Sequence, residues 1–211
     1  MKLKAIAALA VFAAFAALSG CETMSADQCA AADWGALGYQ DANANGSDRY
    51  SERAQSCAQK GITADASAYR TGFDGGMHAF CQPQRGFQFA RAGGTFNGAC
   101  PGELAGDFND AYADGRRVHE VQAALDEARN RVSSAESRRN EADNDIRRHE
   151  RALAAATTDD VRNRLTSEID QLRRERRNAN EDMRVAQEQV PDLMRNVDRV
   201  RAQIGGRYGP W

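Results

Sequence analysis

From Val118 to Ile204 the apolar residues recur at alternating intervals of three and four, which is the spacing of a coiled-coil seam. The phase of this seam changes across residues 157–160. A chain reversal at that point explains the change more simply than one continuous helix does. The pattern therefore predicts an antiparallel helical hairpin over residues 117–205, with arms that each reach about 60 Å.

Two arginines interrupt the seam and indicate its register. In an antiparallel pairing Arg139 faces Ala179 and Arg176 faces Ala142, so that each long side chain lies across a small residue. Pro191 lies within the second arm without disturbing the spacing, so it predicts a kink and not a helix end. The hairpin can present its charged faces to solvent, to acidic lipid or cell-wall polymer, or to a second copy.

The composition changes near residue 115. Nearly all aromatic residues after the N-terminal segment lie between Trp34 and Tyr112, and no glycine occurs between Gly115 and Gly205. Aromatic residues followed three or four positions later by glycine indicate short helices that approach closely. We expect these helices over residues 33–43, 47–60, 65–81 and 101–115, with Ser47 and Asp65 as N-caps and a loop or short hairpin over 82–99.

The fold class that follows is all-α: a small disulfide-braced helical module followed by a long antiparallel coiled-coil hairpin. The expected boundaries are 1–20 for a signal peptide, 21–28 for a lipidated tether, 29–116 for the module, 117–205 for the hairpin and 206–211 for a tail.

The N-terminal residues have the zones of an export signal. Lys2 and Lys4 precede an uncharged apolar run over residues 5–18, which is too short and too rich in alanine for a good membrane-spanning helix. Leu-Ser-Gly-Cys follows at residues 18–21, and this is the pattern of a lipobox. We therefore expect Cys21 to be the lipid-attachment residue and the first residue of the mature chain; a plain secretory signal is the alternative.

An acylated Cys21 makes a membrane the first expected partner, because two or three acyl chains anchor a protein durably. By resemblance to Gram-negative lipoproteins, Glu22 at the next position implies delivery to the outer membrane, on its periplasmic face. The hairpin is then expected to project away from the membrane.

Four of the five cysteines remain once Cys21 is set aside: Cys29, Cys57, Cys81 and Cys100. An even number in an oxidising compartment favours two disulfides. Metal ligation is the alternative, but no CxxC pair is present. Three pairings are possible; an antiparallel arrangement of the first two helices favours 29 with 57, and the loop between the later helices favours 81 with 100.

These cysteines recur with particular Gly, Asp and aromatic residues in a fixed order: Cys29, Asp33, Trp34, Gly38, Asp41, Cys57, Gly61, Tyr69, Gly72, Phe80, Cys81, Gly86, Cys100, Pro101, Leu104, Phe108, Tyr112 and Gly115. This pattern resembles a bacterial envelope family, domain of unknown function 2799, over about residues 29–116. The resemblance implies a cell-envelope location and a fold, and it implies no catalytic residue.

Chemistry-bearing residues in the module are few. Asp33, Asp41, Asp74 and Asp114 could form an acid pair of the glycosidase type, but helix capping and surface solvation explain them at least as well and are favoured. His78 is expected on a helix surface and His149 in the seam. No nucleophile, phosphate-loop, zinc-protease or dinucleotide motif is present, and nothing indicates a cofactor or a metal.

The expected function is that of a non-enzymatic lipoprotein with a structural or protein-binding role in the envelope. Its partner is an envelope protein or a second copy bound through 117–205, and the net charge of −2 does not suggest nucleic acid. The alternative is a cell-wall-directed hydrolase or ligand-binding module that uses the carboxylates of the Cys-rich region.

Overall fold

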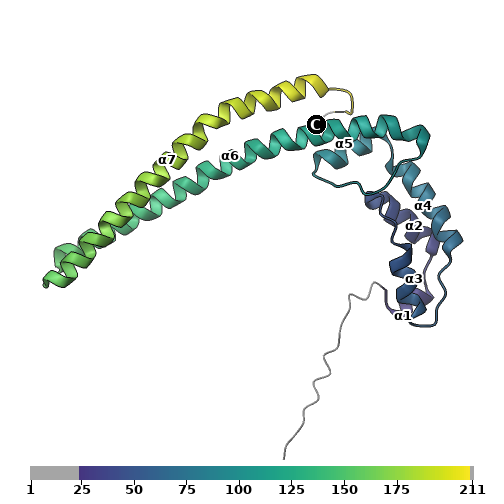
Figure 1. Ribbon diagram of the computed structural model, residues 1–211, viewed down its shortest axis with the longest axis horizontal. Coiled ribbons are helices and arrows are strands. Elements are labelled where there is room, and N and C mark those ends of the chain that lie inside the picture. The colour runs from purple at the N-terminus through teal and green to yellow at the C-terminus, as the bar shows by residue number, and fades with distance from the viewer. Residues whose placement is uncertain (1–23, 210–211) are drawn as a thin grey trace, which may run out of the picture.

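The computed structural model describes residues 24–209, so Cys21, the expected signal peptide, Pro210 and Trp211 lie outside the described residues. Within the described part every regular element is a helix (Figure 1), as the all-α prediction requires. The helices are α1 (Ala26–Ala30), α2 (Trp34–Asn45), α3 (Tyr50–Ala58), α4 (Ala66–Phe80), α5 (Pro83–Arg91), α6 (Gly102–Ala155) and α7 (Asp159–Ile204). None of these helices is both long and apolar enough to cross a membrane.

The stretch expected as a tether is already part of the module. Met24 is buried, with 5 % of its surface exposed, and α1 begins at Ala26. Ser25 caps this helix by accepting from Gln28 N, and the Gln28 side chain accepts from Ser25 N in return. Residues 24–28, which were expected to be tether, therefore belong to the module.

The caps of α2 and α4 use aspartates. Asp33 Oδ1 accepts from Ala36 N at 2.9 Å, and Asp65 Oδ1 accepts from Ala68 N at 2.9 Å. The prediction for Ser47 was wrong, because α3 begins at Tyr50. Gly46 ends α2 with a φ of 74°, and residues 47–49 connect it to α3.

Helices α2 and α4 pack against one another through glycines. A Cβ at Gly72 would lie 1.8 Å from the carbonyl oxygen of Gly35, and a Cβ at Gly38 would lie 2.0 Å from that of Tyr69. These distances leave no room for any side chain, so the glycines serve close helix approach, as their spacing predicts.

Two disulfides brace the module. Cys29 is bonded to Cys57, which joins α1 to the end of α3, and Cys81 is bonded to Cys100, which closes the segment that contains α5. These are the two pairs that the order of the expected helices favours.

The segment 82–99 differs from the sequence-based expectation. It contains helix α5 where a loop or short hairpin was expected, because Gly86 permits close packing and does not end the helix: a Cβ there would lie 2.8 Å from the Phe108 ring. Phe87 and Ala90, one turn apart on the same side, are fully buried.

The helix expected over 101–115 continues without a break to Ala155, so its predicted end was wrong. Gly115 allows α6 to approach α5, since a Cβ there would lie 2.4 Å from the carbonyl oxygen of Phe87. One helix thus contributes to both the module and the hairpin, and no linker separates them.

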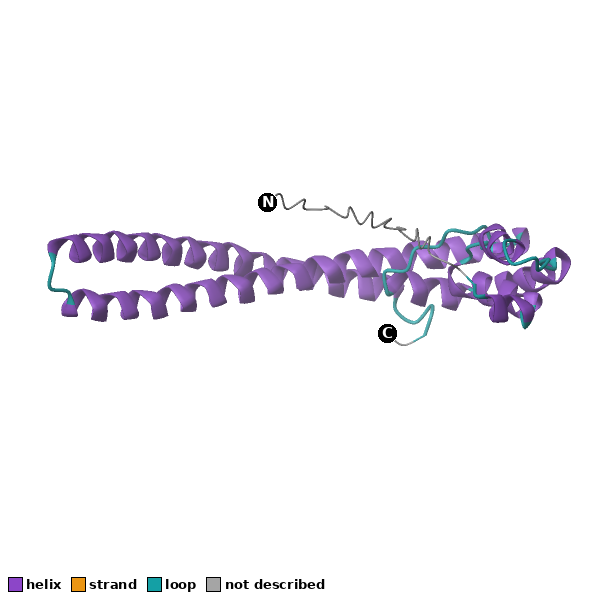
Figure 2. Cartoon of the chain, turned by 90° about the horizontal axis from the view of Figure 1, so that it is seen from below, coloured by secondary structure: helices purple, strands orange, loops and turns teal. Residues whose placement is uncertain are grey.

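Helices α6 and α7 form the predicted antiparallel hairpin, with the chain reversal between Ala155 and Asp159. They lie side by side at the tip in Figure 2 and near the module in Figure 1, so they wind around each other as coiled-coil helices do. Ion pairs and hydrogen bonds across the hairpin agree with the predicted register: Arg138 with Asp182, Arg131 with Gln189, and Arg173 with Glu150.

Helix α7 continues through Pro191, as its undisturbed seam predicts. The buried seam is thin, because alanines occupy many of its positions; on α6 these are Ala128, Ala135 and Ala142, and on α7 they are Ala179 and Ala186. Arg176 extends to Asp143 at 3.2 Å, beside Ala142, as the predicted register requires.

The whole molecule is an arch (Figure 1). One leg is the module, with α1 and α3 at its free end and α5 at its other end, where the hairpin starts. The hairpin forms the other leg and curves so that its concave side faces the side of the molecule on which α1 lies.

Candidate functional site

The four carboxylates that could have formed an acid pair have separate roles. Asp33 caps α2, Asp41 is buried between helices, Asp74 is exposed on α4, and Asp114 binds the end of the chain. Within residues 24–209, no hydrogen bond connects any of these four to another.

Asp41 is the centre of a buried polar network. Its carboxylate accepts from Arg53 Nε at 2.8 Å, from Arg53 Nη2 at 2.6 Å and from the Tyr69 hydroxyl at 2.8 Å. Asp41 is 6 % exposed and the Arg53 side chain 13 %. The network joins α2, α3 and α4, and it satisfies the charge of a carboxylate that burial alone would penalise.

The same network changes the acidity of Tyr69. Burial raises the pKa of its hydroxyl, and the hydrogen bond to Asp41 adds to the rise, while the hydrogen bond from Arg49 N opposes it. The hydrogen bond to Asp41 also raises the pKa of Arg53. Tyr69 therefore stays protonated and Arg53 stays charged at neutral pH, which suits a structural brace.

Most of this Cys-braced, glycine-packed module matches a known family, although α1 and Cys29 precede the match. Residues 33–117 match the family DUF2799, described as a protein of unknown function. No curated protein and no solved structure matches the chain. The DUF2799 match ends within α6, so the family region includes the base of the hairpin and excludes most of its length.

The histidines lie in ordinary surroundings. His78 is 55 % exposed on α4 and 3.9 Å from Glu103. His149 is in the seam, where its Nδ1 donates to the Asp145 carbonyl and its Nε2 lies 3.3 Å from Glu168. Within the described part of the chain no three His, Cys, Asp or Glu side chains gather in a way that could hold a metal ion.

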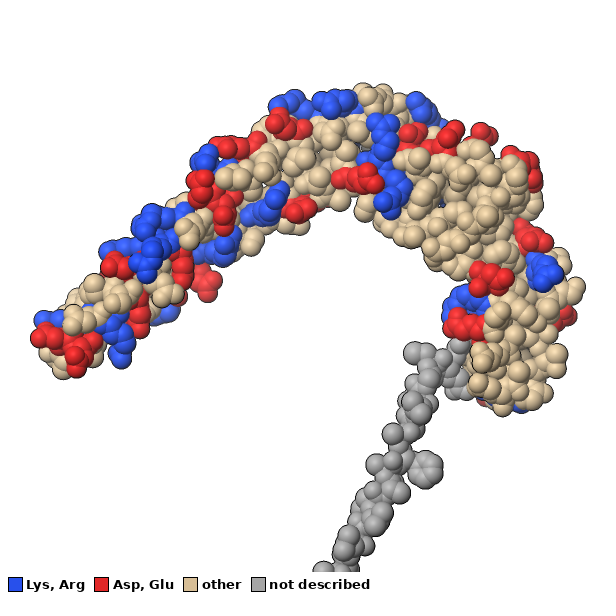
Figure 3. Space-filling view, in the orientation of Figure 1, with Lys and Arg blue, Asp and Glu red and all other residues tan. Residues whose placement is uncertain are grey.

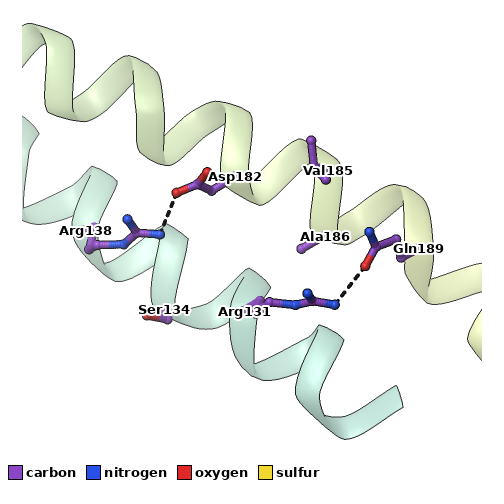
Figure 4. A pocket seen from close by; sticks show the side chains of 7 residues that line it. All are labelled: Arg131, Ser134, Arg138, Asp182, Val185, Ala186 and Gln189. Atoms are coloured by element: carbon purple, nitrogen blue, oxygen red, sulfur yellow. Dashed lines mark hydrogen bonds and ion pairs between the residues drawn. The ribbon is translucent and has the colours of Figure 1, made fainter. Parts of the chain in front are cut away.

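One hollow of the surface lies on the hairpin, outside the DUF2799 region. We call it the hairpin groove, a cavity of about 300 Å³ lined by Arg131, Ser134, Arg138, Asp182, Val185, Ala186 and Gln189. Figure 4 shows that two polar bridges cross it, Arg138 to Asp182 at 2.9 Å and Arg131 to Gln189 at 2.8 Å. Val185 points outward there and is 42 % exposed, so the groove has an apolar point between charged rims.

Charge distinguishes the hairpin from the DUF2799 region (Figure 3). Lys, Arg, Asp and Glu cover the arm in mixed order, whereas the visible face of the module has few of them. All the cationic residues between 117 and 205 are arginines. The charges pair locally, for example Arg184 with Glu181 and Glu188. In the described part of the chain these ion pairs place positive and negative side chains next to one another on the arm.

The returning end of the chain is fastened to the DUF2799 region. The Tyr208 ring stacks on Phe87 with centroids 4.7 Å apart, and its hydroxyl donates to Asp114 Oδ2 at 3.1 Å. Arg207 reaches the same oxygen at 3.0 Å. We call these contacts the tail latch. The sequence offered no signal for them, because Phe87 and Asp114 lie more than ninety positions before Arg207 and Tyr208 and share no motif with them.

Proposed function

We propose that this protein is a non-enzymatic, lipid-anchored protein of the outer membrane, on its periplasmic face, in which the module holds the hairpin for a structural or protein-binding role. The observation that carries the proposal is the long hairpin itself, which is joined to a disulfide-braced module by a continuous helix and a tail latch. This arrangement fixes the direction in which the long surface of the hairpin extends from the module.

The location is supported by two independent features. The export signal and the Leu-Ser-Gly-Cys sequence at residues 18–21 are typical of an acylated envelope protein. The pairing of the four other cysteines into two disulfides suits an oxidising compartment.

A binding role for the hairpin is supported by its groove. Buried Ala186 and exposed Val185 lie between the Arg131–Gln189 and Arg138–Asp182 bridges, which gives a helical partner an apolar contact and polar groups on both sides. A helix with mixed charges is the partner that fits, because the rims offer both signs.

Mass spectrometry of the protein purified from membranes tests the anchor. We expect a mature chain that begins at Cys21 with acyl chains attached, and a Cys21→Ser variant that no longer fractionates with the outer membrane. A non-acylated chain that begins at another residue would contradict the anchor.

Photo-crosslinking in intact cells tests the binding role. A photoreactive residue at Val185 should give a discrete crosslinked band, and one at Ser137, which is exposed on α6 and lies outside the groove, should not. A band of twice the monomer mass identifies a second copy as the partner. Equal, diffuse labelling from both positions would contradict a specific groove.

A shortened hairpin provides an independent test. Deleting residues 132–145 together with 173–186 removes two heptads from each helix, retains the register and leaves the tail latch in place. We expect this variant to stay folded and anchored but no longer to co-purify with the partner that crosslinks at Val185 in the full-length protein. Unchanged function in cells would contradict a role for the arm.

One feature favours a second candidate function, that of a ligand-binding module. An open cleft of about 620 Å³ lies at the end of α2 and is lined in part by Asp41, Asn45, Ser47, Phe89 and Asn97. Amide and hydroxyl groups beside an aromatic ring suit a neutral polar ligand such as a glycan. Titration with soluble cell-wall glycan fragments tests this, with Thr95→Trp, at the exposed rim, expected to block any binding.

A further inference from the structure

The distance between the expected lipid-attachment residue and the folded module is very short. Only three Cα–Cα steps separate Cys21 from Met24, and they span at most about 11 Å. If Cys21 carries acyl chains, as proposed above, the surface around Met24 is restricted to the immediate neighbourhood of the lipid headgroups.

Met24 is firmly built into the module. Its N–H donates to Ser56 Oγ at 3.3 Å, the Ser56 hydroxyl donates back to its carbonyl at 3.1 Å, and its sulfur lies 3.9 Å from Cys57 Sγ. Met24 also belongs to the buried cluster that contains Trp34 and Tyr69. The module therefore cannot move away from the membrane by releasing chain at this point without losing core contacts.

The surface next to Met24 is formed by residues 24–32 and 59–64, which we call the anchor end. The Cys29–Cys57 disulfide joins the first segment to the end of α3, directly before the second segment. Partly buried Ala32, Ile62 and Ala64 pack on the cluster beneath it. In Figure 1 it lies at the α1 end of the module, opposite the base of the hairpin.

The chemistry of the anchor end suits contact with headgroups. Its charged residues are one acid, Asp27, and one base, Lys60, and most of the others are Ala, Gly, Ser, Thr or Gln. The amine of Lys60 donates to the Ser56 carbonyl at the end of α3. Few charges need to be desolvated when this surface approaches a bilayer, in contrast to the densely charged hairpin.

We propose that the anchor end docks directly on the phospholipid headgroups and that the short attachment holds it there. The proposal rests on the acylation of Cys21. It has a consequence for the hairpin: the arm starts at the opposite end of the module and curves with its concave side toward the membrane, so it extends over the membrane surface. This differs from the expectation that the hairpin projects away from it.

The test uses the acylated full-length protein in vesicles of phosphatidylethanolamine and phosphatidylglycerol with a headgroup-attached nitroxide quencher. A fluorescent amino acid is placed at Gln59, in the anchor end, or at Thr95, an exposed residue near the other end of α2. We expect at least threefold stronger quenching at Gln59 than at Thr95. Equal quenching at both positions, or stronger quenching at Thr95, would overturn the proposal.

A matched variant isolates the role of the attachment length. A twelve-residue Gly-Ser insertion after Thr23 leaves the module unchanged and adds a flexible reach of about 20 Å. It should reduce quenching at Gln59 at least twofold while the protein stays in the membrane. Undiminished quenching would show that the short attachment does not hold the module and would overturn the proposal.

Mass spectrometry of the same sample distinguishes a failure of the proposed acyl anchor from a failure of the proposed docking. Absence of acyl chains on Cys21 refutes the proposed anchor and, with it, the docking. An acylated protein that shows no preference for quenching at Gln59 refutes the docking alone and leaves the proposed anchor intact.

Discussion

The module and the hairpin are both helical, but different interactions hold them together. The module depends on backbone contacts between glycines, aromatic clusters such as Phe80 with Phe96 and Phe108, two disulfides and a buried ion pair. The hairpin depends on a thin seam and on ion pairs at its surface. A short helical module thus needs specific buried contacts, whereas a long hairpin distributes its stability over many small ones.

Removing all four disulfide cysteines should reveal the largest difference in stability between the two regions. Each disulfide contributes about 2–5 kcal/mol, so replacing Cys29, Cys57, Cys81 and Cys100 by Ala should destabilise the module by about 4 kcal/mol or more. Hydrogen exchange should then accelerate over α2–α4 and remain slow along the central hairpin. Uniform acceleration over the whole chain would mean that the two regions unfold as one.

Gly72→Ala tests the contact between α2 and α4. The new Cβ would lie 1.8 Å from the Gly35 carbonyl oxygen, so the helices must separate, and we expect a loss of about 3 kcal/mol or more in urea unfolding. Gly75→Ala is the matched control on the same helix. Its nearest neighbour is a Tyr39 ring atom at 3.8 Å, so it should be neutral or stabilising by about 0.5–1 kcal/mol.

Asp41→Asn and Asp182→Asn compare a buried with an exposed ion pair. Loss of the Asp41 charge leaves Arg53 buried without its counter-charge and should cost about 3 kcal/mol. Arg138 and Asp182 are both 55 % exposed, so the second variant should cost less than about 1 kcal/mol. Chemical denaturation of the two variants checks the difference, and similar losses would refute it.

Tyr208→Ala should release the tail latch, with a loss of about 1–2 kcal/mol from the Phe87 stack and the Asp114 hydrogen bond. The effect should be local: hydrogen exchange should become faster near Val200 and Ile204 and should not change at the hairpin tip. Val185→Ala, at an exposed position, should change stability by less than about 0.5 kcal/mol.

The smallest expected effect is a loss of folding stability at alkaline pH. Burial raises the pKa of Tyr69 in the folded protein, so below about pH 10 both the folded and unfolded states are protonated and its full contribution is present. As the pH rises above this value the unfolded state ionises first, and stability should fall. Tyr69→Phe should weaken this decline; an unchanged slope between pH 9 and 11 would contradict it.

Much of the architecture could be predicted because it depends on periodicity and helix order. The seam predicted the hairpin, its reversal and its register, and the order of the expected helices favoured the disulfide pairs that the structure contains. One error concerns a glycine. The segment that contains Gly86 was expected to be a loop or short hairpin, whereas Gly86 lies inside α5 and allows this helix to approach α6. A glycine that ends a helix and one that packs a helix look alike until the neighbouring backbone is known.

The sequence by itself determined that this chain is helical, where its two regions lie and which residues form the hairpin seam, because these properties depend on local spacing. Only the tertiary structure decided that α6 joins the regions without a linker, that Asp41 is buried with Arg53 and Tyr69, and that Tyr208 returns to Phe87. Those contacts join residues far apart in the chain, and their energy depends on burial and geometry that no local pattern encodes.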